Sequence, residues 1–315
     1  MKLRSLYIRI LTCLLTIAAY AYLVYRLVIF DDYSAVVDGF SAAGGYEWLC
    51  LLLILLLMPV NVCCEACRWQ LLLRGVESVS LLDAHRQVYY GYVGAFVTPG
   101  RVGDYPARVL LLRDSSHWSA AVVMGGVGVL AMYVVEIVLG VPAWVLLSRY
   151  ELGVPMRDVL VAVLVVLLIM TVVFIAVRRL PRYAWCGARL RQCCEGVSRL
   201  SGRDLLQLLL LSVLRYVVWL VQLSLALRFS GVVLTPVELL MAIPAYYLLL
   251  GVVPTVPVAD IAVRGSLSIL VFGVFSPNTA GIAIAIVVIW IVNTMLPMLV
   301  GTMVKKNNLQ PILTN

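Results

Sequence analysis

The longest apolar segment of this chain that meets the length of a membrane span is residues 118–148, which read WSAAVVMGGVGVLAMYVVEIVLGVPAWVLLS. Glu136 is its only charged residue. A helix that crosses the roughly 30 Å hydrocarbon core of a bilayer needs about 20 apolar residues, because each residue adds about 1.5 Å to its length. The stretch therefore predicts a membrane-spanning helix.

The rest of the chain repeats this pattern. The other segments of sufficient length are about 8–30, 47–67, 157–178, 205–229 and 278–304. Hydrophobic residues make up 63% of the chain and charged residues only 13%, whereas soluble domains contain about 45–50% and about 25%. We expect an all-α polytopic membrane protein with about six full transmembrane helices, organised as one transmembrane domain over residues 1–315.

Two pairs of shorter apolar segments flank breaks that contain proline or glycine. They are about 84–97 with 105–113, and about 236–253 with 261–275. Their lengths favour two broken or re-entrant helical hairpins over independent spans. The alternative that 236–253 and 261–275 each cross the bilayer stays open.

The two hairpins resemble each other in sequence. The shared elements, in order, are a hydroxyl with an acid three residues on (Ser80 and Asp83; Thr235 and Glu238), a Tyr-Tyr pair followed by glycine (Tyr89, Tyr90 and Gly94; Tyr246, Tyr247 and Gly251), and an acid four residues before arginine (Asp104 and Arg108; Asp260 and Arg264). The hydroxyl–acid spacing is typical of a helix start. The series indicates an inverted repeat with halves at about 1–150 and 151–315, which is the plan of many secondary transporters.

The net charge of +8 is distributed by side. Basic residues concentrate at the N-terminus, at the C-terminal Lys305 and Lys306 and in the loop 178–204, whereas the first predicted outer loop carries acids such as Asp31 and Asp32. The positive-inside rule places both termini and this loop in the cytoplasm. Because the arginines lie at helix ends, we expect them to face anionic lipid rather than nucleic acid.

Charged residues inside the breaks are the main functional clue: Arg101, Asp104, Arg108, Asp260 and Arg264. Each costs about 2.5–3.5 kcal/mol at a helix centre facing lipid, so each must pair, meet water or bind a polar ligand. An acid one helical turn before an arginine favours an ion pair. One interpretation is a polar cavity whose arginines hold a lipid phosphate. The alternative is that each pair only neutralises itself near the interface.

Other polar residues lie within predicted spans. Glu136 and Arg215 should face the protein interior, where they pair, line the same cavity or make a buried structural contact. Asn61, Glu65 and Arg68 lie at the cytoplasmic end of the second span, where we expect an interfacial anchor. The alternative is that they flank an entrance. For Asn293 we expect an interhelical hydrogen bond.

The sequence contains no Ser/His/Asp set, phosphate-binding glycine loop, dinucleotide fingerprint or histidine spacing for a metal. Cys64 and Cys67 have C-x-x-C spacing without a second ligand pair, so we expect them to pack as small apolar residues. We expect no catalytic residues, cofactor or metal, and no enzyme activity.

The motifs resemble one family. Residues 68–73 (RWQLLL), residues 98–104 (TPGRVGD) with Arg108, and the second break from Pro254 to Asp260 with Arg264 are similar to the lysylphosphatidylglycerol synthase/flippase transmembrane family. The resemblance implies a bacterial cytoplasmic-membrane protein that moves a lipid headgroup between leaflets, with the five charged residues of the breaks in a central cavity. It does not extend to the soluble aminoacyl-transferase domain of bifunctional members, so the synthase reaction is not expected here.

We therefore expect a flippase-like protein that moves a charged phospholipid or a lipid-linked headgroup, with membrane lipids as its partners. One alternative is a non-transporting component or regulator of a cell-envelope pathway, whose protein partner docks on the basic loop 178–204. The other is an intramembrane transferase.

Overall fold

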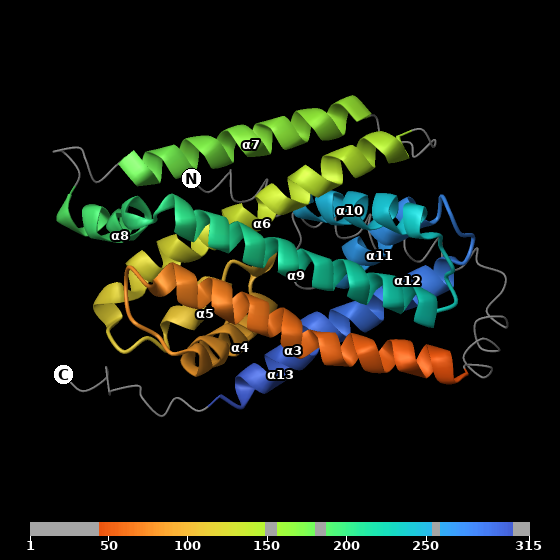
Figure 1. The fold of residues 1–315 in the computed structure, drawn as a ribbon, viewed down its shortest axis with the longest axis horizontal. Helices are drawn as coiled ribbons and strands as arrows, with labels where there is room; N and C mark the ends of the chain where they lie inside the picture. The colour runs from red at the N-terminus through yellow and green to blue at the C-terminus, as the bar shows by residue number, and fades with distance from the viewer. Residues whose placement is uncertain (1–43, 149–155, 180–186, 254–258, 305–315) are drawn as a thin grey trace, which may run out of the picture. The chain divides into compact units, whose positions relative to one another are not determined.

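The computed structural model describes residues 44–148, 156–179, 187–253 and 259–304, and all regular elements in these ranges are helical (Figure 1). In chain order they are α3 (Gly45–Leu73), α4 (Leu81–Val97), η1 (Pro99–Arg101), α5 (Asp104–Val109), η2 (Ser115–His117), α6 (Trp118–Leu147), α7 (Met156–Arg179), α8 (Ala188–Arg199), α9 (Gly202–Phe229), α10 (Pro236–Val252), α11 (Asp260–Phe272), α12 (Thr279–Trp290), the π-helix η4 (Ile291–Met295) and α13 (Leu296–Thr302).

Five helical segments in the described ranges are long and apolar enough to cross a membrane. They are Gly45–Leu73, Ser115–Leu147, Arg157–Arg179, Gly202–Phe229 and Thr279–Thr302. These confirm five of the six predicted spans, and the remaining one, at 8–30, lies outside the described residues. The chain is an all-α, multi-pass integral membrane protein.

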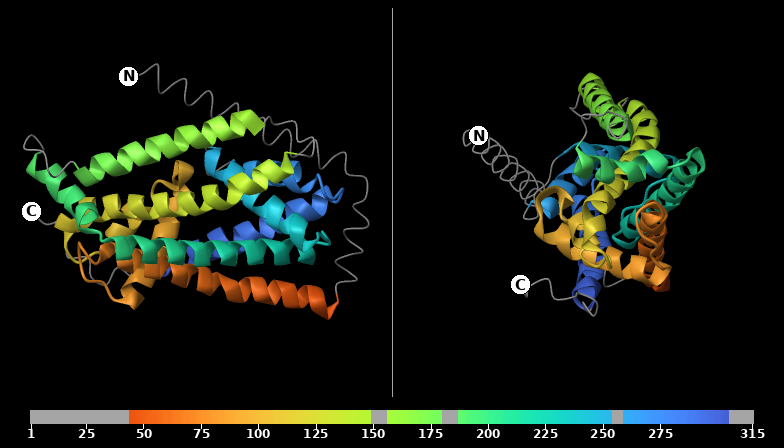
Figure 2. Two further views of the ribbon diagram at one scale, coloured as in Figure 1. Left: turned by 45° about the horizontal axis from the view of Figure 1, so that its top comes forward. Right: turned by 90° about the vertical axis from the view of Figure 1, so that its left-hand side faces the viewer.

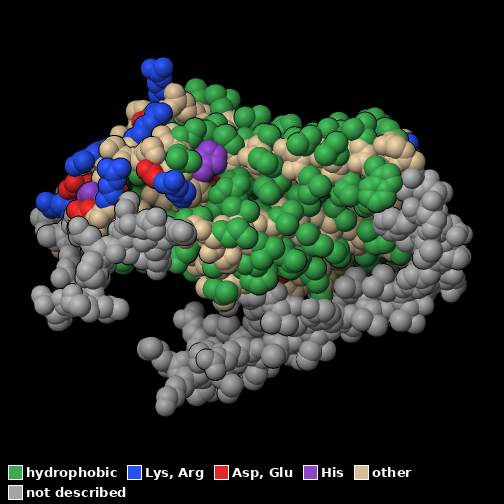
Figure 3. All heavy atoms as spheres, turned by 90° about the horizontal axis from the view of Figure 1, so that it is seen from below, with side chains coloured by type: hydrophobic (Ala, Val, Ile, Leu, Met, Phe, Trp, Pro, Cys, Tyr) green, Lys and Arg blue, Asp and Glu red, His purple; other side chains and the backbone are tan. Residues whose placement is uncertain are grey.

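The surface of α7 indicates that this fold is surrounded by lipid. In the most apolar 18 residues of α7, only 11% are buried, against 39% in the corresponding part of α3. Large aliphatic side chains of α7, such as Leu164, Leu168 and Val172, are between half and two-thirds exposed. A helix that is hydrophobic all round and remains exposed requires a lipid environment. On the face seen in Figure 3, hydrophobic side chains likewise cover most of the described surface, and the charged ones gather in one part of it.

The described residues belong to two compact units that interleave along the chain. Unit 1 comprises 1–58, 136–159 and 219–293, and unit 2 comprises 59–135, 160–218 and 294–315. Each unit contains one of the two predicted hairpins, α10–α11 in unit 1 and α4–α5 in unit 2. The repeat halves 1–150 and 151–315 are a different division of the chain and stay a prediction.

The hairpin of unit 2 begins as the sequence predicts. Ser80 caps α4 by accepting a hydrogen bond from the backbone N–H of Asp83 at 3.1 Å. With 17 residues, α4 measures about 25 Å and is too short to cross the hydrocarbon core. Thr98 then closes the break, because its hydroxyl donates to the Gly94 carbonyl and accepts from the Gly103 N–H, both at 2.8 Å.

Glycine lets the two arms of this hairpin touch. A Cβ added at Gly94 would lie 2.3 Å from the Gly103 carbonyl oxygen, well inside van der Waals contact. On another side of α4, a Cβ at Gly301 of α13 would lie 2.1 Å from the Tyr89 carbonyl oxygen. As a result, α4 packs closely on both α5 and α13 (Figure 1).

The hairpin of unit 1 also starts at the predicted cap. Thr235 and Glu238 form a capping box, in which each side chain accepts from the other residue's backbone N–H. Its second arm, α11, packs against both α10 and α12, and the three helices lie together in Figure 2. Residues 254–258 of the predicted second break lie outside the described residues.

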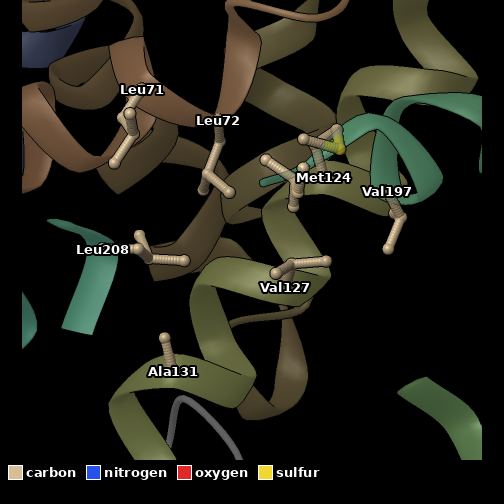
Figure 4. Packing of buried hydrophobic residues seen from close by; sticks show 8 residues of the cluster. Leu71, Leu72, Met124, Val127, Ala131, Val197 and Leu208 are labelled. Carbon is tan, nitrogen blue, oxygen red and sulfur yellow. The ribbon is translucent and has the colours of Figure 1, made fainter. Parts of the chain in front are cut away.

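Unit 2 has a continuous apolar core. It joins Leu71 and Leu72 of α3 to Met124 and Val127 of α6, and it includes Val197 from α8 (Figure 4). Through Val197 the short, arginine-rich helix α8 turns its apolar face to the bundle, while its Arg191 and Arg199 remain exposed. This core joins α3, α6, α8 and α9.

Candidate functional site: a buried ion-pair cluster

One face of α3 carries polar side chains in its buried half. Asn61, Glu65 and Arg68 occupy positions i, i+4 and i+7, which lie on the same side of a helix. They are only 1%, 2% and 2% exposed. The predicted interfacial anchor is therefore wrong, because an anchoring charge reaches the headgroups, whereas these groups contact other helices of unit 2.

Glu65 is the centre of this arrangement. Its Oε1 accepts a hydrogen bond from Arg108 of α5 at 2.7 Å, and its Oε2 accepts from Arg68 of α3 and from Arg215 of α9. Arg215 also donates from Nε to the Asn61 side-chain oxygen at 2.9 Å. A single buried carboxylate thus joins three guanidinium groups from three helices.

Arg108 is held on all sides. It binds Asp104 through two parallel hydrogen bonds, Nε to Oδ1 at 2.7 Å and Nη2 to Oδ2 at 2.9 Å, which confirms the ion pair predicted from their spacing. Its guanidinium carbon also lies 4.5 Å from the ring centre of Tyr105 and 5.4 Å from that of Trp69. Cation–π contacts of this kind favour a charged, desolvated guanidinium.

Two glycines allow α5 to bring these side chains in. A Cβ at Gly91 of α4 would lie 2.3 Å from Oδ1 of Asp104, and a Cβ at Gly125 of α6 would lie 2.3 Å from Cδ1 of Tyr105. Any larger residue at either position would displace α5 or its side chains. The small residues of α4 and α6 are therefore part of the site.

We call Glu65, Arg68, Asp104, Arg108 and Arg215 the Glu65 cluster. Three arginines against two acids leave it with a formal charge of +1. Arg68 is further bound to the Gly128 carbonyl oxygen, while its buried Nε has no hydrogen-bond partner in the described part of the chain. The cluster is thus one negative charge short of neutrality, and a buried charge without a counter-charge is energetically costly.

Arg101 lies at the turn of the hairpin, three residues before Asp104 of the cluster. It is partly exposed, and within the described ranges it makes no salt bridge. Its guanidinium carbon stacks 5.4 Å from the ring centre of Tyr92 of α4. The backbone of Arg101 is left-handed, with φ of +58°, an unusual conformation for a residue other than glycine.

Unit 1 holds the second predicted ion pair. Arg264 donates from Nε to Oδ1 of Asp260 at 2.9 Å, and Trp290, the last residue of α12, donates from its indole N–H to Oδ2 at 3.0 Å. The two charged side chains are 19% and 16% exposed. The pair is thus fixed by a side chain from the neighbouring helix α12.

Comparison with protein-family models matches residues 10–301 to the lysylphosphatidylglycerol synthase TM region. The chain belongs to this lysylphosphatidylglycerol synthase transmembrane family. The resemblance carried by the motifs around Arg101 and Asp260 is thereby confirmed. A comparison with proteins of curated function gives no match.

The predicted site residues of this family member fall into two groups. Arg101, Asp104, Arg108 and Arg215 lie in unit 2, while Glu136, Asp260 and Arg264 lie in unit 1. Arg215 binds Glu65 and Asn61, and Glu136 is partly buried on α6. A pairing of Glu136 with Arg215, and the placement of all these residues in one cavity, stay predictions.

Glu65, Arg68 and Trp290 are the residues whose roles the sequence analysis missed. Glu65 and Arg68 stand at the end of an apolar run, where charges usually reach the interface. Their spacing with Asn61 on one helix face was the available clue. The indole N–H of Trp290 gives no comparable pattern. Asn293, in contrast, donates to Gln222 of α9 at 2.9 Å, which confirms the predicted interhelical hydrogen bond.

The described residues offer no alternative centre based on a metal. Within them no group of three or more His, Cys, Asp or Glu side chains is arranged to hold an ion. Cys64 is a buried free thiol, and Cys67 is a partly buried one. The arrangement is suited to binding an anion through arginines.

Proposed function

We propose that this protein moves a lipid with an anionic or zwitterionic headgroup between the leaflets of a bacterial cytoplasmic membrane, with both termini in the cytoplasm. The observation that carries this proposal is the Glu65 cluster, a set of buried charges with a surplus of +1 inside a membrane protein. We assign the chain no chemical reaction.

The energetic argument concerns the cost of such charges. Each ionised side chain costs about 2.5–3.5 kcal/mol at the centre of a membrane helix facing lipid, so ion pairs in membrane proteins are expected to be complete or functional. A self-neutralised structural pair needs equal numbers of acids and bases. An additional guanidinium is of use to a protein that binds a phosphate, because guanidinium matches phosphate oxygens in a bidentate fashion.

The two hairpins support the transport part of the proposal. Each has an Asp–Arg pair at the start of its second arm, and each follows a helix start with the same cap chemistry. We propose that they are the two copies of an inverted repeat. In such transporters, discontinuous helices form the substrate site and rocking of the repeats alternates access to it.

Leaflet exchange in reconstituted vesicles tests the proposal. The substitution Arg101→Ala removes the partly exposed guanidinium at the turn of this hairpin and should slow exchange of a fluorescent anionic phospholipid at least tenfold. Arg86→Ala is the matched control, because the Arg86 side chain is 57% exposed at the start of the same hairpin and pairs with Asp83 alone among the described residues. Unchanged exchange by a folded Arg101→Ala protein would remove the proposal.

A second candidate function rests on the exposed arginines of unit 2. Arg191, Arg199 and Arg203 lie on or next to α8 and face away from the core. They would suit an acidic protein partner, as expected for a regulatory membrane component. Replacing these three residues by glutamine separates the two candidates: a transporter retains lipid exchange, whereas a regulator loses its partner in a pull-down from native membranes.

A further inference from the structure

The carboxylate of Glu65 uses both oxygens for arginine. Oε1 serves Arg108, and Oε2 serves Arg68 and Arg215 together. A phosphodiester also presents two anionic oxygens to guanidinium groups, with the same preference for paired hydrogen bonds. Glu65 therefore occupies its arginines in the way that a bound phosphate would.

The three arginines differ in how firmly they are held. Arg108 has a second acid, Asp104, and is 2% exposed. Arg68 is equally enclosed and also bound to the Gly128 carbonyl oxygen. The side chain of Arg215 is 12% exposed and forms a salt bridge with Glu65. Exchange of a carboxylate for another anion is least costly at Arg215.

The surroundings of Arg215 suit such an exchange. The Asn61 side-chain oxygen can continue to accept from Nε of Arg215 while the Glu65 carboxylate at Nη1 is exchanged for another anion. A phosphate oxygen can accept from the remaining N–H groups of Arg215 in place of the carboxylate.

We propose that Glu65 is an internal counter-anion that occupies Arg215 until the anionic part of a headgroup displaces it. The ligand class is a phosphate-type anion, taken up at Arg215, while Arg68 and Arg108 keep Glu65 in place. Glu65 then competes with the substrate and keeps its binding weak enough for release. This inference takes its ligand class from the proposed function but makes a separate claim about binding.

The test compares anion binding by wild type and by Glu65→Gln, purified in a neutral detergent, using isothermal titration calorimetry. The probes are dihexanoyl phosphatidylglycerol, its zwitterionic phosphatidylcholine counterpart and inorganic phosphate. We expect about tenfold tighter binding of phosphatidylglycerol to Glu65→Gln, because the competing carboxylate is gone. The phosphatidylcholine lipid should gain less. Tighter binding of inorganic phosphate as well would support an anion subsite that needs no lipid tail; tightening for the lipid alone would support one that does.

Glu65→Asp serves as a second, milder variant that keeps the charge but shortens its reach to Arg215, and several-fold tighter binding is expected. A folded Glu65→Gln or Glu65→Asp protein that binds phosphatidylglycerol no tighter than wild type would overturn the inference. Failure of the proposed function is recognised separately. In that case the wild type shows no leaflet exchange, whatever the binding constants of wild type and Glu65→Gln.

Discussion

The substitution Glu65→Gln should be among the most destabilising single changes in unit 2. It removes the carboxylate that bridges Arg68, Arg108 and Arg215, and it raises the formal charge of the cluster from +1 to +2. Breaking a buried ion pair by removing one partner costs about 3–5 kcal/mol, because the remaining charge is left uncompensated. Glu65 is 2% exposed, so water offers little relief.

Unfolding in mixed micelles of increasing dodecyl sulfate content, followed by circular dichroism, measures this loss. Glu195→Gln provides the control, because Glu195 also pairs with an arginine of its own helix, Arg199 at i+4, but with side chains 41% and 65% exposed. Exposed pairs of this kind contribute about 0.3–0.5 kcal/mol. The double variant Glu65→Gln, Arg68→Met should lose less than the sum of the two single variants, since it restores the surplus to +1.

If Glu65→Gln and Glu195→Gln lose similar stability, or if the double variant is strictly additive, the Glu65 cluster is not an interdependent ion-pair network.

Three further changes probe the architecture around the site. Gly94→Ala should lower the free energy of unfolding by about 1–3 kcal/mol in the same assay, since its Cβ meets the Gly103 carbonyl oxygen at 2.3 Å. Gly126→Ala is the control: nothing lies within 4 Å of a Cβ there, so the free energy of unfolding should rise by up to about 1 kcal/mol. Equal effects would contradict the close approach of α4 and α5. Trp290→Phe should cost about 1.5–3 kcal/mol by removing the hydrogen bond to the Asp260 carboxylate, and a loss below that of Glu195→Gln would count against that bond. At the entry to α6, the hydrogen bonds of the Ser116 backbone and side chain lower the pKa of the exposed Asp114 carboxyl from its ordinary 3.8. A lowered pKa in the folded state stabilises the protein at pH above 3.8, and this contribution is lost as the pH falls through the folded value, so Asp114→Asn should flatten the acid limb of a pH–stability curve.

The membrane spans could be predicted because hydropathy and length are local properties. The same holds for the caps at Ser80 and Thr235 and for the Asp104–Arg108 and Asp260–Arg264 pairs, whose partners are one helical turn apart. For all of these, short-range spacing contains the geometric information, and the structure agrees.

The centre of the candidate site could not be predicted in the same way. Glu65 binds Arg108 and Arg215, which are 43 and 150 residues away in sequence. The sequence of α3 does not show that the six-residue helix α5 will pack against its polar face. That packing depends on close contacts of α5 with glycines of α4 and α6. Burial of Glu65 is thus a tertiary property, and without it a charge at the end of an apolar run favours an anchor.

The left-handed backbone of Arg101 has a consequence for how this hairpin turn can evolve. Glycine tolerates φ of +58° freely, whereas other residues lose about 1 kcal/mol or more there. Selection for thermal robustness alone would therefore drift toward glycine or asparagine at this position, at the expense of the guanidinium. Persistence of arginine in natural variants would mark the turn as a place where activity outweighs stability, and a library screened only for heat resistance should lose that arginine early.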